Sequence, residues 1–182
     1  MNYRKPGLFL GFPYCSGKCN KEAGTIVCQN QQLHSADLIS ISIEEIIERY
    51  KRNPITKCLI IGGLEPFDSI YDLVSICYKW AEEFYQPYIR DIEQREHPII
   101  IYTGYYPFEI SDKISDLARA QLHFPHPVII KYGRYIPGYK NHKDPVLGVE
   151  LASDNQYAEF LGSTIRKLTL YYIENEKEDN DE

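Results

Sequence analysis

Three of the five cysteines in this chain lie close together near its amino terminus. Cys15, Cys19 and Cys28 share a stretch with glycine, lysine and asparagine, a composition typical of a loop. Thiolates gathered on a loop are soft ligands for zinc or for the iron of an iron–sulfur cluster, and nearby lysines lower thiol pKa values. The spacing therefore predicts a metal centre.

The number of thiols separates the candidate metals. Structural zinc usually has four ligands in a closed tetrahedron, whereas this loop offers three. Cys58 and Cys77 lie in apolar runs and are expected in the core. Three protein ligands on a four-iron cluster would leave one iron open to a substrate or cofactor. Two alternatives stay open: a zinc site completed by His34, and three free thiols.

A second stretch carries a resemblance to a known family. The apolar run from Lys57 to Ile61 ends in Gly62-Gly63, followed by Leu64 and Glu65-Pro66. This resembles the radical S-adenosylmethionine (SAM) enzymes. Their first two cluster cysteines have the spacing of Cys15 and Cys19, and their second strand ends in Gly-Gly-Glu-Pro. The resemblance implies a [4Fe-4S] cluster on Cys15, Cys19 and Cys28, with Gly62 and Gly63 beside the methionine end of SAM.

Within that superfamily, the chain most resembles the activating proteins of anaerobic ribonucleotide reductases. The resemblance rests on Thr103-Gly104-Tyr105, on Lys131 to Tyr135, and on Ser153 to Gln156. It implies an enzyme that cleaves SAM reductively and generates a glycyl radical on a large reductase subunit. An electron donor such as flavodoxin or ferredoxin would supply the reducing electron.

Other candidate cofactor contacts follow from the same resemblance. Glu65 is expected either to orient the SAM amino group or to cap the next turn. Thr103 is expected to hydrogen-bond either the ribose or carboxylate of SAM or the backbone of its own turn. Asn30 is expected to hold the cluster loop or to act as a turn residue. Lys131 and Arg134 are expected to meet SAM or the partner, or to be solvated.

The sequence departs from the family pattern in two places. Eight residues separate Cys19 from Cys28, more than in the usual cluster loop. We interpret them as an insertion that retains the third ligand, because Cys28-Gln29-Asn30 reproduces the Cys-x-Asn of the family. The second departure is Leu64, which separates Gly-Gly from Glu-Pro.

The order of apolar segments predicts an α/β fold. Short apolar runs at 7–12, 57–61, 98–102 and 127–131 are expected strands, and 42–50, 69–84 and 107–121 are expected helices. Alternating strands and helices require parallel pairing. Four strands are too few for a closed eight-stranded barrel, so we expect an incomplete TIM-barrel-like sheet with crossover helices. The run 166–173 is expected to be a further strand because of its Thr and Tyr content.

Length and charge bound the remaining possibilities. The 182 residues predict one domain over 1–173 and an acidic disordered tail over 174–182. A net charge of -6 provides no basic field for nucleic acid, and no apolar stretch is long enough to span a membrane. We expect a cytoplasmic protein, since the odd cysteine count argues against a disulfide framework.

Two other functions remain open from the sequence. One is a radical SAM enzyme acting on a small molecule, similar to the 7-carboxy-7-deazaguanine synthases. The other is a non-enzymatic binding module in which zinc closes the cysteine loop.

Overall fold

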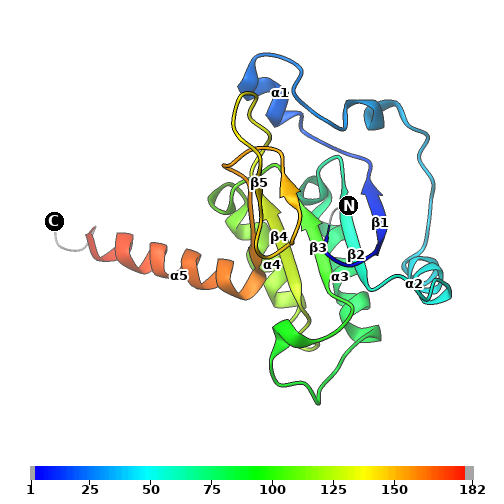
Figure 1. Ribbon diagram of the computed structural model, residues 1–182. Coiled ribbons are helices and arrows are strands. Elements are labelled where there is room, and N and C mark those ends of the chain that lie inside the picture. The colour runs from blue at the N-terminus through cyan, green and yellow to red at the C-terminus, as the bar shows by residue number, and fades with distance from the viewer. Residues whose placement is uncertain (1–2, 179–182) are drawn as a thin grey trace.

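The computed structural model describes residues 3–178, with the side chains of residues 3–175 (Figure 1). The strands are β1 (Gly7–Phe12), β2 (Cys58–Gly63), β3 (Ile99–Tyr102), β4 (Val128–Tyr132), β5 (His142–Lys143), β6 (Glu150–Leu151) and β7 (Tyr157–Phe160). The α-helices are α1 (Lys18–Ala23), α2 (Ile43–Arg52), α3 (Ile70–Glu83), α4 (Ser111–Ala120) and α5 (Leu161–Glu178). Short 3-10 helices are η1 (Gln31–Ser35), η2 (Pro66–Ser69), η3 (Ile92–Gln94) and η4 (Pro107–Ile110).

The main sheet has five strands in the order β1-β2-β3-β4-β7. The first four strands are parallel and lie side by side in chain order, as the sequence predicts. β7 is antiparallel to β4 and has no counterpart among the predicted strands. The ends of the sheet, β1 and β7, do not pair with each other, so the described residues form an open sheet and not a closed barrel.

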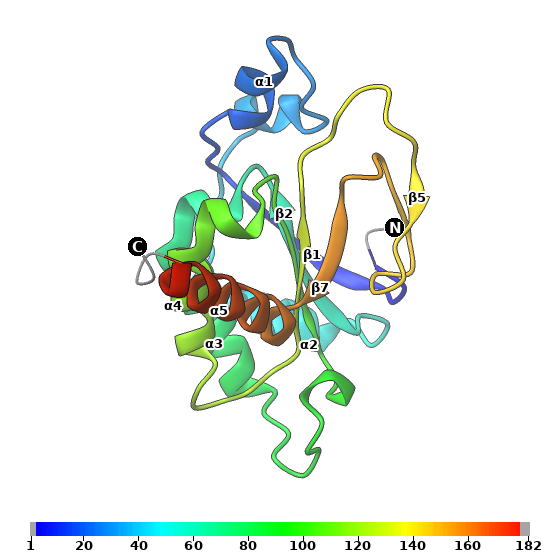
Figure 2. The same ribbon diagram turned by 90° about the vertical axis from the view of Figure 1, so that its left-hand side faces the viewer.

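One face of the sheet is covered by helices α2 to α5 (Figure 2). These helices are amphipathic, and α2 begins at a side-chain cap, where the Ser42 hydroxyl accepts a hydrogen bond from the Glu45 amide (3.1 Å). Their buried side chains pack against alternate residues of the parallel strands, with Trp80 of α3 as the largest. Cys77 lies in this core and Cys58 on the other face, both fully buried, which confirms their predicted place in the core.

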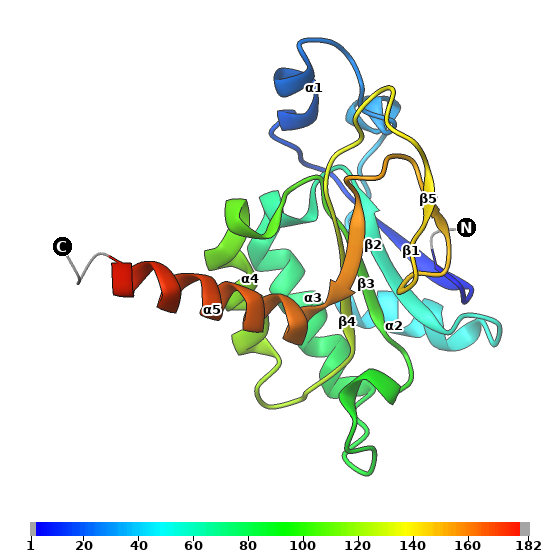
Figure 3. The same cartoon turned by 60° about the vertical axis from the view of Figure 1, so that its left-hand side comes forward.

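The opposite face is covered by loops and by the small two-stranded sheet of β5 and β6 instead of helices (Figure 3). Tyr3, Leu147 and Leu151 pack there against Ile60, Ile100 and Ile129 of the sheet. The Arg4 amide donates to the Leu147 carbonyl (2.9 Å), which joins the amino-terminal segment to the β5–β6 segment. These contacts give the sheet a second, smaller core.

The predicted strand at 166–173 is wrong. These residues lie in α5, which leaves β7 at the sheet edge and extends away from the sheet (Figure 3). Leu161 and Leu168, seven residues apart, are buried on one helical face, and this burial outweighs the strand preference of Thr and Tyr. The helix continues to Glu178, so 174–178 of the predicted disordered tail is helical. The remainder, 179–182, lies outside the described residues.

Within residues 3–178, no helix combines the length and the apolar character that crossing a bilayer requires.

Candidate functional site

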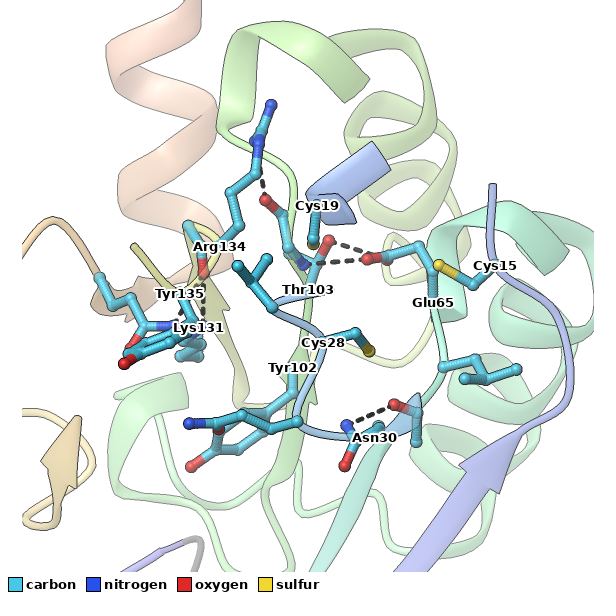
Figure 4. A pocket seen from close by; sticks show the side chains of 18 of the residues that line it. Cys15, Cys19, Cys28, Asn30, Glu65, Tyr102, Thr103, Lys131, Arg134 and Tyr135 are labelled. Carbon is cyan, nitrogen blue, oxygen red and sulfur yellow. Dashed lines mark hydrogen bonds between the residues drawn. The ribbon is translucent and has the colours of Figure 1, made fainter. Parts of the chain in front are cut away.

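All eight residues predicted to bind the cluster or SAM line one cavity (Figure 4). They are Cys15, Cys19, Cys28, Asn30, Gly62, Gly63, Glu65 and Thr103. The cavity lies at the carboxyl ends of the parallel strands and has a volume of about 900 Å³, counting the part that is open to solvent. Parallel strands bring their carboxyl ends to one edge of a sheet, so residues far apart in the sequence meet here.

The three thiols are free and partly buried. The Gly17 amide donates to Cys15 Sγ (3.3 Å). Burial raises the pKa of Cys15 and of Cys19, and for Cys19 the neighbouring thiols add to the increase. The lowered thiol pKa that the nearby lysines led us to expect is therefore wrong for these two residues. No group of three or more His, Cys, Asp or Glu side chains in residues 3–175 is arranged to hold a metal ion.

The residues between Cys19 and Cys28 form a compact loop. Its first part is the short helix α1, which begins after Gly17 and ends at Gly24, both with positive φ. The Asn20 side-chain oxygen accepts hydrogen bonds from the amides of Val27 (2.9 Å) and Cys28 (3.0 Å). These two hydrogen bonds, which we call the Asn20 clasp, bring the end of the loop back to α1. Cys28 therefore lines the same cavity as Cys15 and Cys19. Asn20 belongs to none of the sequence motifs that predict the site.

Two further contacts attach the loop to the sheet. The Asn30 side chain donates to the Gly63 carbonyl (2.8 Å), which joins the segment after Cys28 to the end of β2. On the other side, Arg134 forms ion pairs with Glu22 of α1 and with Glu109 of η4. Lys18 of α1 also pairs with Glu109. The cysteine loop is therefore held from both sides of the cavity.

The glycine pair is constrained by the neighbouring strand. Gly63 has φ 87°, and a Cβ there would lie 2.9 Å from the Gly11 Cα and 2.9 Å from the Phe12 nitrogen. A side chain at Gly62 would lie 3.3 Å from the Phe9 ring. Packing against β1 is thus sufficient to require glycine at position 63. The inserted Leu64 is accommodated because its amide donates to the Phe12 carbonyl (3.2 Å).

Glu65 is the buried carboxylate of the site. Its Oε1 accepts from the Phe67 amide (3.1 Å) and the Thr103 hydroxyl (2.8 Å), and its Oε2 accepts from the Gly104 amide (2.9 Å). Burial raises the Glu65 pKa to about 7, although these three hydrogen bonds oppose the increase. A carboxylate has about four acceptor sites, so capacity for one more donor remains. Glu65 and Thr103 join the ends of β2 and β3.

Lys131 supplies a buried positive charge in the same cavity. Its side chain is 7% exposed and donates to the Gly133 carbonyl (2.5 Å). Burial lowers the Lys131 pKa to about 8, while Glu65 and Cys19 oppose the decrease. The expectation of a simply solvated lysine is therefore wrong. The ring of Tyr102 and the Gln156 amide also line the cavity; the sequence offered no motif for Tyr102.

Two of the segments that carry the family resemblance, 131–135 and 153–156, meet beside Lys131. The Gln156 side chain donates to the Gly133 carbonyl (3.1 Å), and the Asn155 side chain donates to the Arg134 carbonyl (2.9 Å). The segment 153–156 thus packs beside the segment 131–135, and Lys131, Gly133, Arg134, Tyr135 and Gln156 line the cavity. His34, by contrast, is exposed on η1 and does not line the cavity, so the structure does not bring it to the cysteines.

No protein-family model, no curated protein and no solved structure matches this chain.

Proposed function

We propose that this protein is a radical SAM enzyme that activates an anaerobic ribonucleoside-triphosphate reductase. Cys15, Cys19 and Cys28 would hold a [4Fe-4S] cluster, and the adjoining cavity would hold SAM. When bound, the cluster and SAM supply one-electron cleavage of the sulfonium, which yields methionine and a 5′-deoxyadenosyl radical. The chain itself positions these groups and limits the access of water.

The observation that carries the proposal is the convergence of the eight predicted residues on one cavity. They come from the end of β2 and from the loops that follow β1, β2 and β3, and they lie up to 88 positions apart, from Cys15 to Thr103. Soft thiols are chemically suited to iron, and they line the cavity from one loop that is clasped by Asn20. We infer that metal binding draws the three sulfurs together within this loop.

The charges of the cavity suit the methionine part of SAM. An α-amino acid carries an ammonium and a carboxylate. The cavity offers a buried residue of opposite charge for each, Glu65 for the ammonium and Lys131 for the carboxylate. Glu65 has remaining acceptor capacity for the ammonium, and Lys131 lacks an ion pair to any described carboxylate. A charged buried pair is favourable when a ligand supplies the opposite charges.

The winding of the sheet also supports a partial barrel of the radical SAM type. β1 to β4 are adjacent in chain order, and the helices cover one face only. A doubly wound sheet places helices on both faces, whereas a (β/α) barrel places them only outside. We propose that this sheet is an arc of such a barrel, with the cavity at its carboxyl edge.

The partner follows from the sequence resemblance. We propose that a glycine-bearing loop of the large reductase subunit enters the open side of the cavity and loses a hydrogen atom to the 5′-deoxyadenosyl radical. A flavodoxin or ferredoxin would supply the electron. The alternative, a small-molecule substrate, uses the same cavity and the same SAM chemistry.

The test is anaerobic reconstitution with iron and sulfide, followed by reduction in the presence of SAM. We expect a brown protein that forms 5′-deoxyadenosine. The Cys28→Ala variant is expected to lose the product by at least about 100-fold, the order of loss typical when a metal-site group is removed. Cys77→Ala serves as the matched control, because Cys77 is buried in α3 far from the cavity lining.

A colourless, zinc-loaded wild type without 5′-deoxyadenosine would contradict the proposal and favour the zinc module. If 5′-deoxyadenosine forms, the reductase subunit is added and the glycyl radical doublet is sought by electron paramagnetic resonance. A silent spectrum with turnover of SAM would favour the small-molecule enzyme.

A further inference from the structure

The carboxyl-terminal half of α5 extends beyond the rest of the protein and exposes apolar side chains. The helix leaves the sheet at β7 and projects past α4 (Figures 1 and 3). Five large apolar side chains of α5 and the adjoining η4 are each between 45% and 58% exposed: Phe108, Leu170, Tyr171, Tyr172 and Ile173. A concentration of exposed apolar side chains on one part of a surface is typical of an interaction site.

Two opposite faces of α5 are apolar. Leu161 and Leu168 pack in the core below the sheet. Each residue turns the helix by about 100°, so Leu170 and Ile173 lie on the side away from Leu168. A helix packed against a single core needs only one apolar face. The second face of α5 therefore lacks a covering element among the described residues.

This second face is accessible along the whole helix. Gly162, Arg166 and Thr169 continue it towards the start of α5, and all three are exposed. A Cβ placed on Gly162 would have no other atom within 4 Å. Another helix therefore has room to lie along the full length of α5.

Two charged side chains lie on either side of the apolar centre. Arg166 is four residues before Leu170 and Glu174 is four residues after it, so the three residues form one row on the helix. Neither charge forms an ion pair with another residue in 3–175. At about 1.5 Å per residue, Arg166 and Glu174 are about 12 Å apart along the axis, too far to pair with each other.

We propose that α5 of a second copy of this chain binds this face in the antiparallel direction, about a two-fold axis beside Leu170. This pairing places Arg166 of each copy beside Glu174 of the other and brings Leu170 of both copies to the centre. The row is complementary to its own reversed copy, as a two-fold interface requires. A parallel pair would place like charges side by side. A partner with one kind of charge would match only one end of the row.

The test is sedimentation equilibrium of the full chain at micromolar to submillimolar concentrations. We expect the wild type to show a reversible monomer–dimer equilibrium. Ile173→Lys places a charge beside the apolar centre and is expected to weaken association by at least about tenfold. The control is Ile55→Lys, at an exposed isoleucine between α2 and β2, which should leave the dissociation constant unchanged.

Charge reversal tests the direction of pairing. In the homodimer, Arg166→Glu would place only acidic side chains at the two charged contacts, and Glu174→Arg only basic ones. We expect each variant alone to associate about tenfold more weakly than the wild type, because two attractions become repulsions. An equal mixture of the two variants restores both pairs and should associate as tightly as the wild type. Circular dichroism and thermal unfolding verify that each variant is folded.

A wild type that stays monomeric over this concentration range would overturn the proposal. So would association that Ile173→Lys does not weaken. Single charge reversals without effect would exclude the antiparallel arrangement, because a parallel pair already places like charges together. These measurements need neither iron nor SAM, so they do not depend on whether the protein cleaves SAM.

Discussion

His97 shows how a single residue organises the amino edge of the sheet. It is the one non-glycine residue with positive φ (58°) in residues 3–178. Its carbonyl accepts hydrogen bonds from Trp80 Nε1 (2.8 Å) and His126 Nε2, and its ring bonds the Tyr50 hydroxyl (2.7 Å). These contacts compensate for the strained backbone. His97 and His126 precede β3 and β4, at the edge of the sheet opposite the cysteine cavity.

Through His126, the free energy of unfolding of the protein should depend on pH. Its pKa is lowered from 6.5 to about 4 in the folded protein, so the folded state disfavours the protonated ring. Its contribution is present above pH 6.5 and is lost as the pH falls from 6.5 towards 4. We expect this residue to lower the free energy of unfolding by about 2 kcal/mol between pH 7.5 and pH 5.

Urea unfolding at the two pH values measures this effect. His126→Gln should show a smaller decrease in stability on acidification, whereas His34→Gln, in an exposed residue, should match the wild type. An unchanged pH dependence in His126→Gln would contradict the assignment. His97 contributes in the same direction, since burial also lowers its pKa.

The three cysteines lie in one connection between β1 and α2, which contains the short helix α1. α1 has no buried residue of its own. It depends on Arg134 for its position and on the Asn20 clasp for its return to the sheet. Helices this short are unstable alone, so side-chain contacts must supply their stability.

Asn20 should therefore affect metal loading more than folding. Asn20→Ala removes the acceptor for the Val27 and Cys28 amides, and we expect it to lower the iron content of reconstituted protein severalfold. The free energy of unfolding should change by less than about 1 kcal/mol, because the loop contributes little to the core. Iron and sulfide analysis with urea unfolding tests this. Lys21→Ala, exposed in the same loop, is the control and should load iron normally.

The helical structure of α5 can be tested by two leucine substitutions. Leu168 is 5% exposed and Leu170 is 58% exposed. In a strand, residues two apart point to the same face, whereas in a helix they do not. Leu168→Ala should lower the free energy of unfolding by about 3 kcal/mol and Leu170→Ala by less than about 1 kcal/mol. Equal losses in the two variants would contradict the helix.

In the whole molecule, one face of the main sheet is covered by helices. The other face has a second cover, formed by the amino-terminal segment and the chain that contains β5 and β6. Asp144 stabilises the second cover by hydrogen bonds to backbone amides. It is 1% exposed, and its carboxylate accepts from the amides of Val146 (2.9 Å), Leu147 (2.7 Å) and Ala158 (2.9 Å). The bond to Ala158 attaches the cover to β7, and Leu147 belongs to the smaller core.

Asp144→Ala should destabilise the whole protein, because three backbone amides, two of them in buried hydrogen bonds, lose their acceptor at once. We expect the free energy of unfolding to decrease by about 3 kcal/mol or more. Asp154→Ala, at an exposed residue, should change it by less than about 0.5 kcal/mol. Urea unfolding followed by circular dichroism measures both. A small effect of Asp144→Ala would show that the cover contributes little to folding.

The sequence predicts the four parallel strands, the crossover helices between them and the residues that share the cysteine cavity. Apolar runs of four to six residues form strands wherever they are buried, and parallel strands bring their carboxyl ends together. Cys15, Gly63 and Thr103 were therefore predictable neighbours, since each follows or ends a strand. These features depend on short-range pattern and on a general rule of sheet topology.

Other features were decided only by long-range contacts. The run 166–173 became a helix because the buried face of α5 packs on the core, and β7 became the edge strand in its place. Gly63 is required to be glycine by the backbone of β1, a strand far away in the sequence. Lys131 is buried in a cavity whose lining residues range from Phe9 to Gln156 in the sequence. Burial and close approach depend on which segments meet in space, and this is the information that local residue patterns do not contain.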